Sequence, residues 1–232
     1  TDAYLRAIEN APSYTKAHYN LANSYARQLN YPEAISHYKN VLDIDSTHVS
    51  ARHNLAAMYV RQLNYVQAIE EHEKVLGIDP SHMSTYYDLG YIHFLRGEYE
   101  RVRFLMSEGQ RRDPNDASFL RLLGLTLAKE LKFKAAREKF QESVRLDSTK
   151  AATFVDLAQV CMKLRDYDAA ESAARRGLRL DPHHKEGHFV LSNALRRLGR
   201  TEESQELLKE FKLLDQKLDK IEDQLLMLGN NP

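Results

Sequence analysis

Apolar and small residues recur along the chain with a period of 34 residues, and the clearest copy spans residues 49–82. In this copy Leu55, Ala56 and Tyr59 share one face of a helix. A second stretch of helical spacing follows and ends before Pro80. The pattern predicts two amphipathic helices joined by a turn. A unit this short cannot cover its own apolar faces, so it must stack on copies of itself.

The same pattern divides the whole chain into successive units. We expect the second helix of a truncated repeat at 1–14, full repeats at 15–48, 49–82, 83–116, 117–150 and 151–184, a sixth repeat at 185–216 and a helical extension at 217–232. The eighth place of each repeat is small, occupied in order by Ala22, Ala56, Gly90, Gly124, Ala158 and Ser192. Because a larger side chain would overpack, we expect the two helices of each repeat to cross closely there.

The spacing of leucine, small residue and tyrosine, then alanine, aromatic residue and proline, resembles the tetratricopeptide repeat family along essentially the whole chain. The sequence departs from the family pattern at the fourth place, which has no tryptophan, and at Ser46 and Ser148, which stand where a proline is common. The resemblance implies an all-α fold, a right-handed α-solenoid of helix-turn-helix repeats with a long C-terminal capping helix. It also implies that first helices line a concave groove and second helices form the back.

In that geometry, certain places of each first helix face the groove. The candidate groove residues for peptide binding are Tyr19, Asn20, Asn23, His53, Asn54, Tyr87, Asp88, Tyr91, Arg121, Asp156 and Gln159. Asn20 and Asn54 hold the same place one repeat apart, and their amides can hold an extended peptide backbone. The alternative is that both asparagines only satisfy neighbouring helix groups or solvent. We expect the groove to become apolar later in the chain, at Leu122, Val155 and Val190.

Some family members grip the C-terminal carboxylate of a chaperone with lysine, arginine and asparagine side chains. Asn23 and Asn54 match the asparagines of that clamp. Tyr19, Ser84 and Asp88 stand where its basic residues belong, and Asp88 would repel a carboxylate. The sequence therefore argues against recognition of chaperone tails at these repeats.

Little in the sequence suggests reaction chemistry. His184 and His188 could lie one helical turn apart, but no third metal ligand is evident and the glutamate of the zinc-protease motif is missing. A helix-start histidine and a packed histidine are the favoured interpretation. Cys161 falls at a buried place, which predicts a core thiol rather than a nucleophile. Without a phosphate loop, a catalytic carboxylate pair or a nucleophile elbow, we predict that the segment is not an enzyme and binds no metal or cofactor.

The composition argues against some classes of partner. Lysine plus arginine and aspartate plus glutamate both number 33, and the late arginines are interleaved with acidic residues, which argues against nucleic acid. No apolar run is long enough for a membrane span in this segment. One cysteine rules out an internal disulfide framework and leaves the cytoplasm and a bacterial periplasm both compatible. Because the sequence starts at Thr1 inside a repeat, we expect a longer protein whose remainder carries any targeting signal.

The apolar stripe continues past the sixth repeat, with Leu218, Ile221, Leu225 and Leu228 at alternating spacings of three and four. This heptad stripe predicts a face that caps the array or pairs with a second copy as a homodimer. The predicted function is a non-enzymatic scaffold that binds a peptide segment or helix of a partner protein in the groove. Two alternatives stay open: a self-assembly module built on the C-terminal helix, and the docking segment of a larger enzyme or secretion complex.

Overall fold

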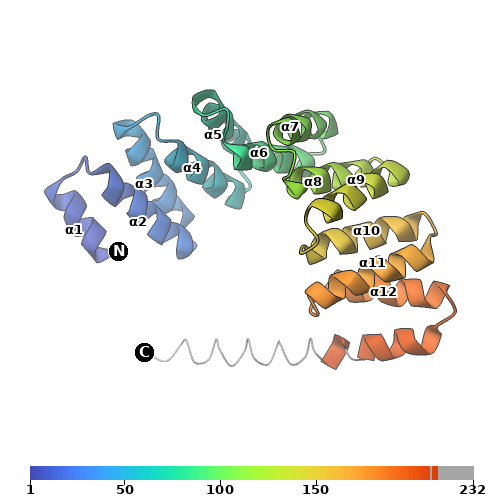
Figure 1. Cartoon of the computed structure of the whole chain (residues 1–232). Coiled ribbons are helices and arrows are strands. Elements are labelled where there is room, and N and C mark those ends of the chain that lie inside the picture. The colour runs from blue at the N-terminus through green and yellow to red at the C-terminus, as the bar shows by residue number, and fades with distance from the viewer. Residues whose placement is uncertain (210, 214–232) are drawn as a thin grey trace. The chain divides into compact units, whose positions relative to one another are not determined.

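A computed structural model describes residues 1–209 and 211–213, and these residues are helical apart from the turns (Figure 1). The chain divides into two compact units, Thr1–Asp113 and Pro114–Pro232. The first unit contains α1 (Asp2–Asn10), α2 (Thr15–Arg27), α3 (Tyr31–Ile44), α4 (Val49–Arg61), α5 (Tyr65–Ile78), α6 (Met83–Leu95) and α7 (Tyr99–Arg112). The second contains α8 (Ala117–Lys129), α9 (Phe133–Leu146), α10 (Ala151–Lys163), α11 (Tyr167–Leu180) and α12 (Lys185–Arg197), followed by helical residues 201–209 and 211–213.

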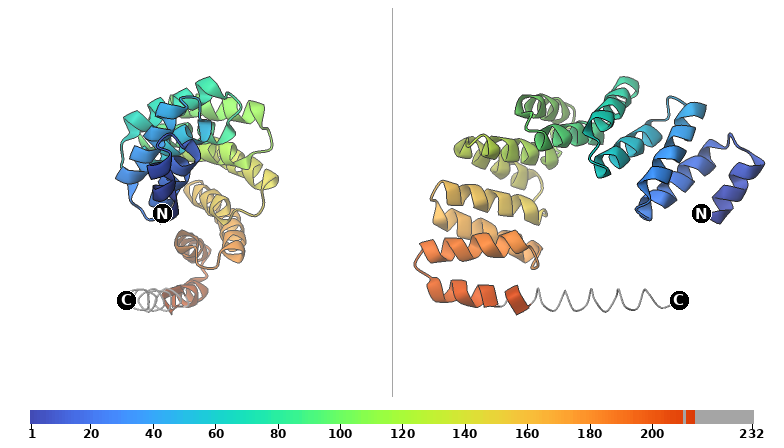
Figure 2. Two further views of the ribbon diagram at one scale, coloured as in Figure 1. Left: turned by 90° about the vertical axis from the view of Figure 1, so that its left-hand side faces the viewer. Right: turned by 180° about the vertical axis from the view of Figure 1, so that it is seen from behind.

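Helices that follow one another in the sequence pack against one another within each unit. Two further views show this order of stacking from other sides (Figure 2). The first helices α2, α4, α6, α8, α10 and α12 begin at places that repeat every 34 residues, from Thr15 to Lys185. Each unit is thus an all-α solenoid of helix-turn-helix repeats, which confirms the predicted fold class.

The turn after each first helix has one recurring backbone conformation. At the fifteenth place of every repeat φ lies between 59° and 80°, in the left-handed region, at Leu29, Leu63, Gly97, Leu131, Arg165 and Gly199. The next amide then donates to a carbonyl near the end of the helix, as Asn64 N does to Tyr59 O at 2.8 Å. This is a Schellman-type helix end, which satisfies helix carbonyls and starts the chain toward the second helix.

The small residues at the eighth place lie where the helices meet. All six are buried, from Ala22 to Ser192. In the last repeat the hydroxyl oxygens of Ser192 and Ser204 are 2.8 Å apart, and Ser204 Oγ also donates to the Ser192 carbonyl at 3.0 Å. The predicted close crossing of the two helices is confirmed.

Polar side chains at the fourth place, where tryptophan was missing, tie first helices to the preceding turn. His18 Nε2 lies 2.9 Å from the Pro12 carbonyl oxygen, and His188 Nε2 lies 2.7 Å from that of Pro182. The Tyr86 hydroxyl donates to the Pro80 carbonyl at 3.2 Å in the same way. In these three repeats the fourth-place side chain thus gives a loop carbonyl a hydrogen-bond partner.

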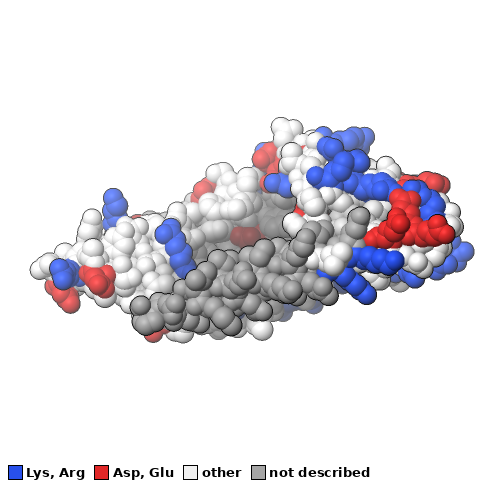
Figure 3. Space-filling view, turned by 90° about the horizontal axis from the view of Figure 1, so that it is seen from below, with Lys and Arg blue, Asp and Glu red and all other residues white. Residues whose placement is uncertain are grey.

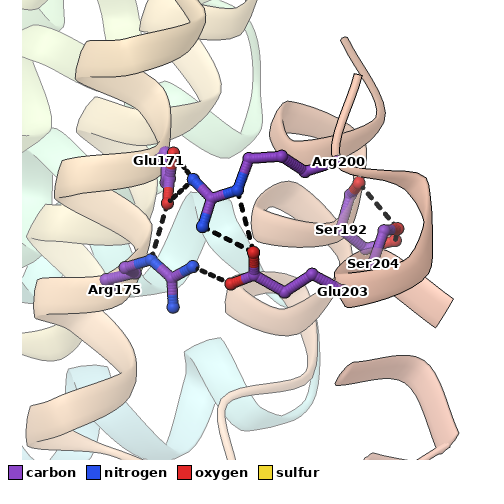
Figure 4. A network of polar contacts seen from close by, with 6 residues as sticks. All are labelled: Glu171, Arg175, Ser192, Arg200, Glu203 and Ser204. Carbon is purple, nitrogen blue, oxygen red and sulfur yellow. Dashed lines mark hydrogen bonds and ion pairs between the residues drawn. The ribbon is translucent and has the colours of Figure 1, made fainter. Parts of the chain in front are cut away.

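A network of charged groups attaches the helical stretch after α12 to α11 (Figure 4). Arg200 donates to Glu171 at 2.7 Å and to Glu203 at 2.8 Å. Arg175 on α11 donates to Glu171 at 2.8 Å and also to Glu203. Four charges that alternate in sign therefore connect one helix to the next, and such a network stabilises more than an isolated surface pair.

The predicted capping or dimer face at Leu218, Ile221, Leu225 and Leu228 lies outside the described residues. Among the residues that are described, no helix has both the length and the apolar character to cross a bilayer.

Candidate protein-binding face

The candidate site residues lie on one set of helices in each unit. We define the first-helix face as the exposed and half-buried side chains of α2, α4 and α6 in the first unit and of α8, α10 and α12 in the second. Side chains of successive first helices touch: Asn54 on α4 donates to Asn23 on α2, and Arg121 on α8 donates to Asp156 on α10. Each unit therefore presents a row of adjacent first helices.

Asn54 is engaged within the protein. Its side-chain nitrogen donates to the Tyr19 hydroxyl and to Asn23 Oδ1, both at 3.2 Å. Tyr38 from α3 donates to the same Asn23 oxygen at 2.5 Å, and burial raises the pKa of Tyr38 to about 12. Because both amide hydrogens of Asn54 are used, only its carbonyl oxygen remains for a ligand. The arrangement favours the structural interpretation of Asn54 over a ladder that holds a peptide backbone.

His53 and Asp88 are brought together, with His53 Nε2 3.6 Å from Asp88 Oδ2. Two further histidines that the sequence analysis missed join them. The ring of His72, from α5, lies 5.3 Å from the His53 ring, and the ring of His82, from the α5–α6 turn, lies 4.9 Å from it. Burial lowers the pKa of His72 to about 3, with smaller contributions from His53 and His82, and burial raises the pKa of Asp88 to about 6.

Tyr87 and Tyr91 form an aromatic row on α6. Their rings are parallel with centroids 6.4 Å apart, and Phe94 continues the row 6.3 Å beyond Tyr91. Tyr91 is 40% exposed, so the middle of this row is open to a ligand. Aromatic side chains of this kind are common anchors of protein interfaces.

Arg121 and Asp156 bind each other. Arg121 Nε donates to Asp156 Oδ2 at 2.7 Å. Burial raises the pKa of Asp156, and the adjacent Arg121 counteracts this effect. A partner that uses either charge would have to replace this ion pair.

Gln159 belongs to a hollow between α10 and α12. The hollow has a volume of about 490 Å³ and is lined by Gln159, Met162, Lys163, Glu186, Phe189, Val190, Asn193 and Arg197. Phe189 is 65% exposed, although it is a large apolar side chain. Gln159 belongs to the predicted site residues, and Val190 was expected at the apolar end of the groove.

The expected apolar end of the groove needs a correction. Leu122 and Val155 are buried, with at most 1% of their surface exposed, because they pack between helices of the second unit. They do not line an open surface. Val190 is also buried, yet it contributes to the wall of the hollow.

The other residues that the sequence analysis considered as metal ligands or as a nucleophile have structural roles. The His184 side chain accepts a hydrogen bond from the Gly187 amide at the start of α12, and His188 contacts the Pro182 carbonyl. Cys161 is a buried free thiol, and burial raises its pKa. On the face seen in Figure 3, basic and acidic side chains lie next to each other rather than in separate areas.

Comparisons with known proteins agree with this architecture. Two tetratricopeptide repeat sequence models match residues 13–81 and 155–212, together more than half of the chain. The comparison with curated proteins gives no match.

Several solved structures share the fold. PilF of Pseudomonas aeruginosa superposes with a TM-score of 0.74 at 20% identity over 91% of this chain and 96% of PilF. MamA gives 0.64 at 19% identity over 72% of this chain and 97% of MamA. YrrB, described as a TPR protein with an unusual peptide-binding site, gives a TM-score of 0.60 at 20% identity over 80% of this chain and 95% of YrrB. With its repeated helix pairs and both sequence matches, the chain belongs to the tetratricopeptide repeat family.

Proposed function

We propose that the chain is a non-enzymatic protein-interaction scaffold whose first-helix face binds a peptide segment or helix of a partner protein. The hollow between α10 and α12 carries this proposal. There the exposed Phe189 ring stands beside the amides of Gln159 and Asn193. An apolar anchor surrounded by a few polar groups is the usual composition of a peptide or ligand site.

The charges at the hollow indicate the chemistry of the partner. Lys163 and Arg197 line it, and neither forms an ion pair within the part of the chain that the structure describes, whereas the one lining carboxylate, Glu186, lies 3.5 Å from His184 Nδ1. Unpaired cations beside an apolar anchor favour a segment in which an apolar side chain is flanked by acidic residues. The peptide-binding site named in the description of YrrB gives this proposal further support.

The aromatic row on α6 offers a second contact area in the first unit. Tyr87 and Tyr91 supply apolar surface. Asn20 lies on α2, another first helix of this unit, and offers an amide for hydrogen bonds with a partner. We propose that this row binds an apolar side chain of a partner within the first unit. Substituting Tyr91 by alanine should then weaken the binding of partners that contact the first unit.

Selection from a displayed peptide library against the full chain tests the proposal. Peptides that bind should carry an apolar residue next to acidic ones, and Lys163→Glu with Arg197→Glu should weaken their binding at least tenfold. The matched control is Lys134→Glu with Arg145→Glu, the same charge change on exposed residues of α9. Equal weakening by both pairs would show a general charge effect and contradict binding at the hollow.

Self-assembly through residues 217–232 is tested separately. Light scattering of the full chain and of a chain ending at residue 216 compares their masses over a range of concentrations. A dimer that the truncation abolishes would favour the self-assembly alternative. A monomer in both cases supports the scaffold.

A further inference from the structure

A set of nitrogen and oxygen donors lies between α4, α5 and α6, and neither the hollow at α10 and α12 nor the aromatic row on α6 uses it. His53, His72 and Asp88 each offer one ligand atom, and these three atoms lie within 4.8 Å of one another. His53 Nε2 and Asp88 Oδ2 are 3.6 Å apart. Two ligands of one tetrahedral zinc ion lie about 3.3 Å apart, given the usual bond lengths. A small movement of side chains would therefore bring the three donors into contact with one ion.

Hydrogen bonds on the far side of the His53 ring hold it in place. His53 Nδ1 lies 3.3 Å from the Thr85 hydroxyl, and that hydroxyl lies 2.7 Å from His82 Nδ1. Thr85 is fully buried. With Nδ1 occupied in this way, Nε2 is the nitrogen directed toward Asp88. A histidine ligand of a metal is commonly oriented by such a bond from its other ring nitrogen.

The Nδ1 atom of His72 is buried and unpaired in the described part of the chain. Its side chain is 1% exposed, and its Nδ1 atom is buried without a hydrogen-bond partner among the described residues. Buried polar atoms are normally paired, so an unpaired one within a group of donors points to a ligand. His72 also occupies the place in its repeat where Tyr38, Met106 and Phe140 pack, so a polar side chain there is not required by the fold.

Asp88 is a half-buried carboxylate whose described ion-pair contact is to His53 and not to a lysine or arginine. Two imidazoles and one carboxylate are a donor set typical of zinc and related divalent transition metals. We propose that His53, His72 and Asp88 bind one divalent transition-metal ion of the zinc class, with Thr85 as the residue that orients His53. The ion would join three consecutive helices of the first unit.

Zinc binding to the full chain, freed of metal by a chelator, tests this site. Calorimetric titration with zinc chloride should show one ion per chain, and zinc should raise the melting temperature. Asp88→Asn keeps the size of the side chain and removes its charge, so it should weaken zinc binding at least tenfold and abolish the thermal shift. Thr85→Val should weaken binding about 10- to 100-fold through the lost orientation of His53.

The matched control is His183→Ala, which removes an exposed histidine of the second unit and should leave zinc affinity unchanged. Circular dichroism of each variant without zinc shows that it is folded. Cobalt in place of zinc should give the visible absorption of a site with nitrogen and oxygen ligands. Zinc binding that Asp88→Asn leaves unchanged, or no binding by the unmodified chain, would overturn the proposal. Neither result would bear on the hollow at α10 and α12, because that site is in the other unit.

Discussion

Gly124 on α8 faces the ring of Phe140 on α9 so closely that a Cβ atom added to Gly124 would lie 2.7 Å from Phe140 Cε1. The Phe140 ring is fully buried, so it cannot turn away into solvent. Real Cβ atoms essentially never make contacts below 3.0 Å, so either the Phe140 ring or the helices would have to shift. The small eighth place is therefore a packing requirement of the repeat.

We predict opposite effects for substitutions at two glycines. Gly124→Ala should lower the free energy of unfolding by roughly 1 kcal/mol or more and Gly124→Leu by about 1–3 kcal/mol, because of overpacking against Phe140. Gly77→Ala on α5 meets no atom within 4 Å and should raise it by about 0.5–1 kcal/mol through helix propensity. Urea denaturation measures all three. A stabilising Gly124→Leu would contradict the close crossing.

Leucine at the left-handed turn should cost stability. Leu63 has φ of 59° and is 72% exposed, so glycine there relieves backbone strain and loses little apolar burial. Leu63→Gly should raise the free energy of unfolding by about 0.5–1 kcal/mol, since strain relief exceeds the added freedom of the unfolded chain. Gly97→Leu is the reverse change at the same place, where φ is 75°, and should destabilise. Thermal unfolding of each variant measures these changes. If both substitutions raised, or both lowered, the melting temperature, this account of the turn would be contradicted.

His37, which contacts His18, should make stability depend on pH. Their Nδ1 atoms are 3.0 Å apart, so one donates and the other accepts. Burial, and then His18, lower the pKa of His37 below 6.5, while the unfolded chain keeps the ordinary value. The unfolded state therefore binds the proton first, so the contribution of His37 is present above pH 6.5 and is lost as the pH falls.

The measurement is urea denaturation between neutral pH and about pH 5. His37→Phe keeps an aromatic ring beside Tyr25 and should lose less stability than the unmodified chain over this range. His183→Ala, at an exposed histidine, should keep the original slope. A His37→Phe variant with the original slope would show that His37 does not contribute to the pH dependence.

Cys161 should react with thiol reagents only after unfolding. The side chain is 2% exposed, and burial raises its pKa, so both access and thiolate are limited in the folded state. Reaction with a disulfide reagent, followed by absorbance, should be slow in buffer and fast in denaturant. A fast reaction in buffer would mean that α10 opens readily.

Much of this fold follows from the spacing of small and apolar residues. The small eighth place indicated the close crossing seen at Gly124 and Ser192, because volume at a helix contact is restricted in the same way in every repeat. The left-handed turn was harder to foresee, since Leu29, Leu63, Leu131 and Arg165 occupy a conformation that usually favours glycine. The left-handed conformation is evident only in the structure, where it recurs at the fifteenth place of all six repeats.

The proposed metal site was less predictable than the fold. His53 and Asp88 were singled out from their places on first helices, but their partner His72 comes from a second helix, at a place that is usually packed core. A histidine at that core place was the available signal. For Asn54, sequence supplies the amide but not its neighbours, and these neighbours decide that it is occupied within the protein. Side-chain partners from other repeats thus limit what spacing alone can show.

The affinity of a selected peptide for two phenylalanine variants tests the scaffold function most directly. Phe189 lies in the hollow of the first-helix face, whereas Phe104, 52% exposed, lies on the second helix α7. Fluorescence polarisation with the full chain should show binding weakened at least tenfold by Phe189→Ala and unchanged by Phe104→Ala. Binding that Phe189→Ala leaves intact and Phe104→Ala weakens would contradict the proposal and place the partner on the second helices.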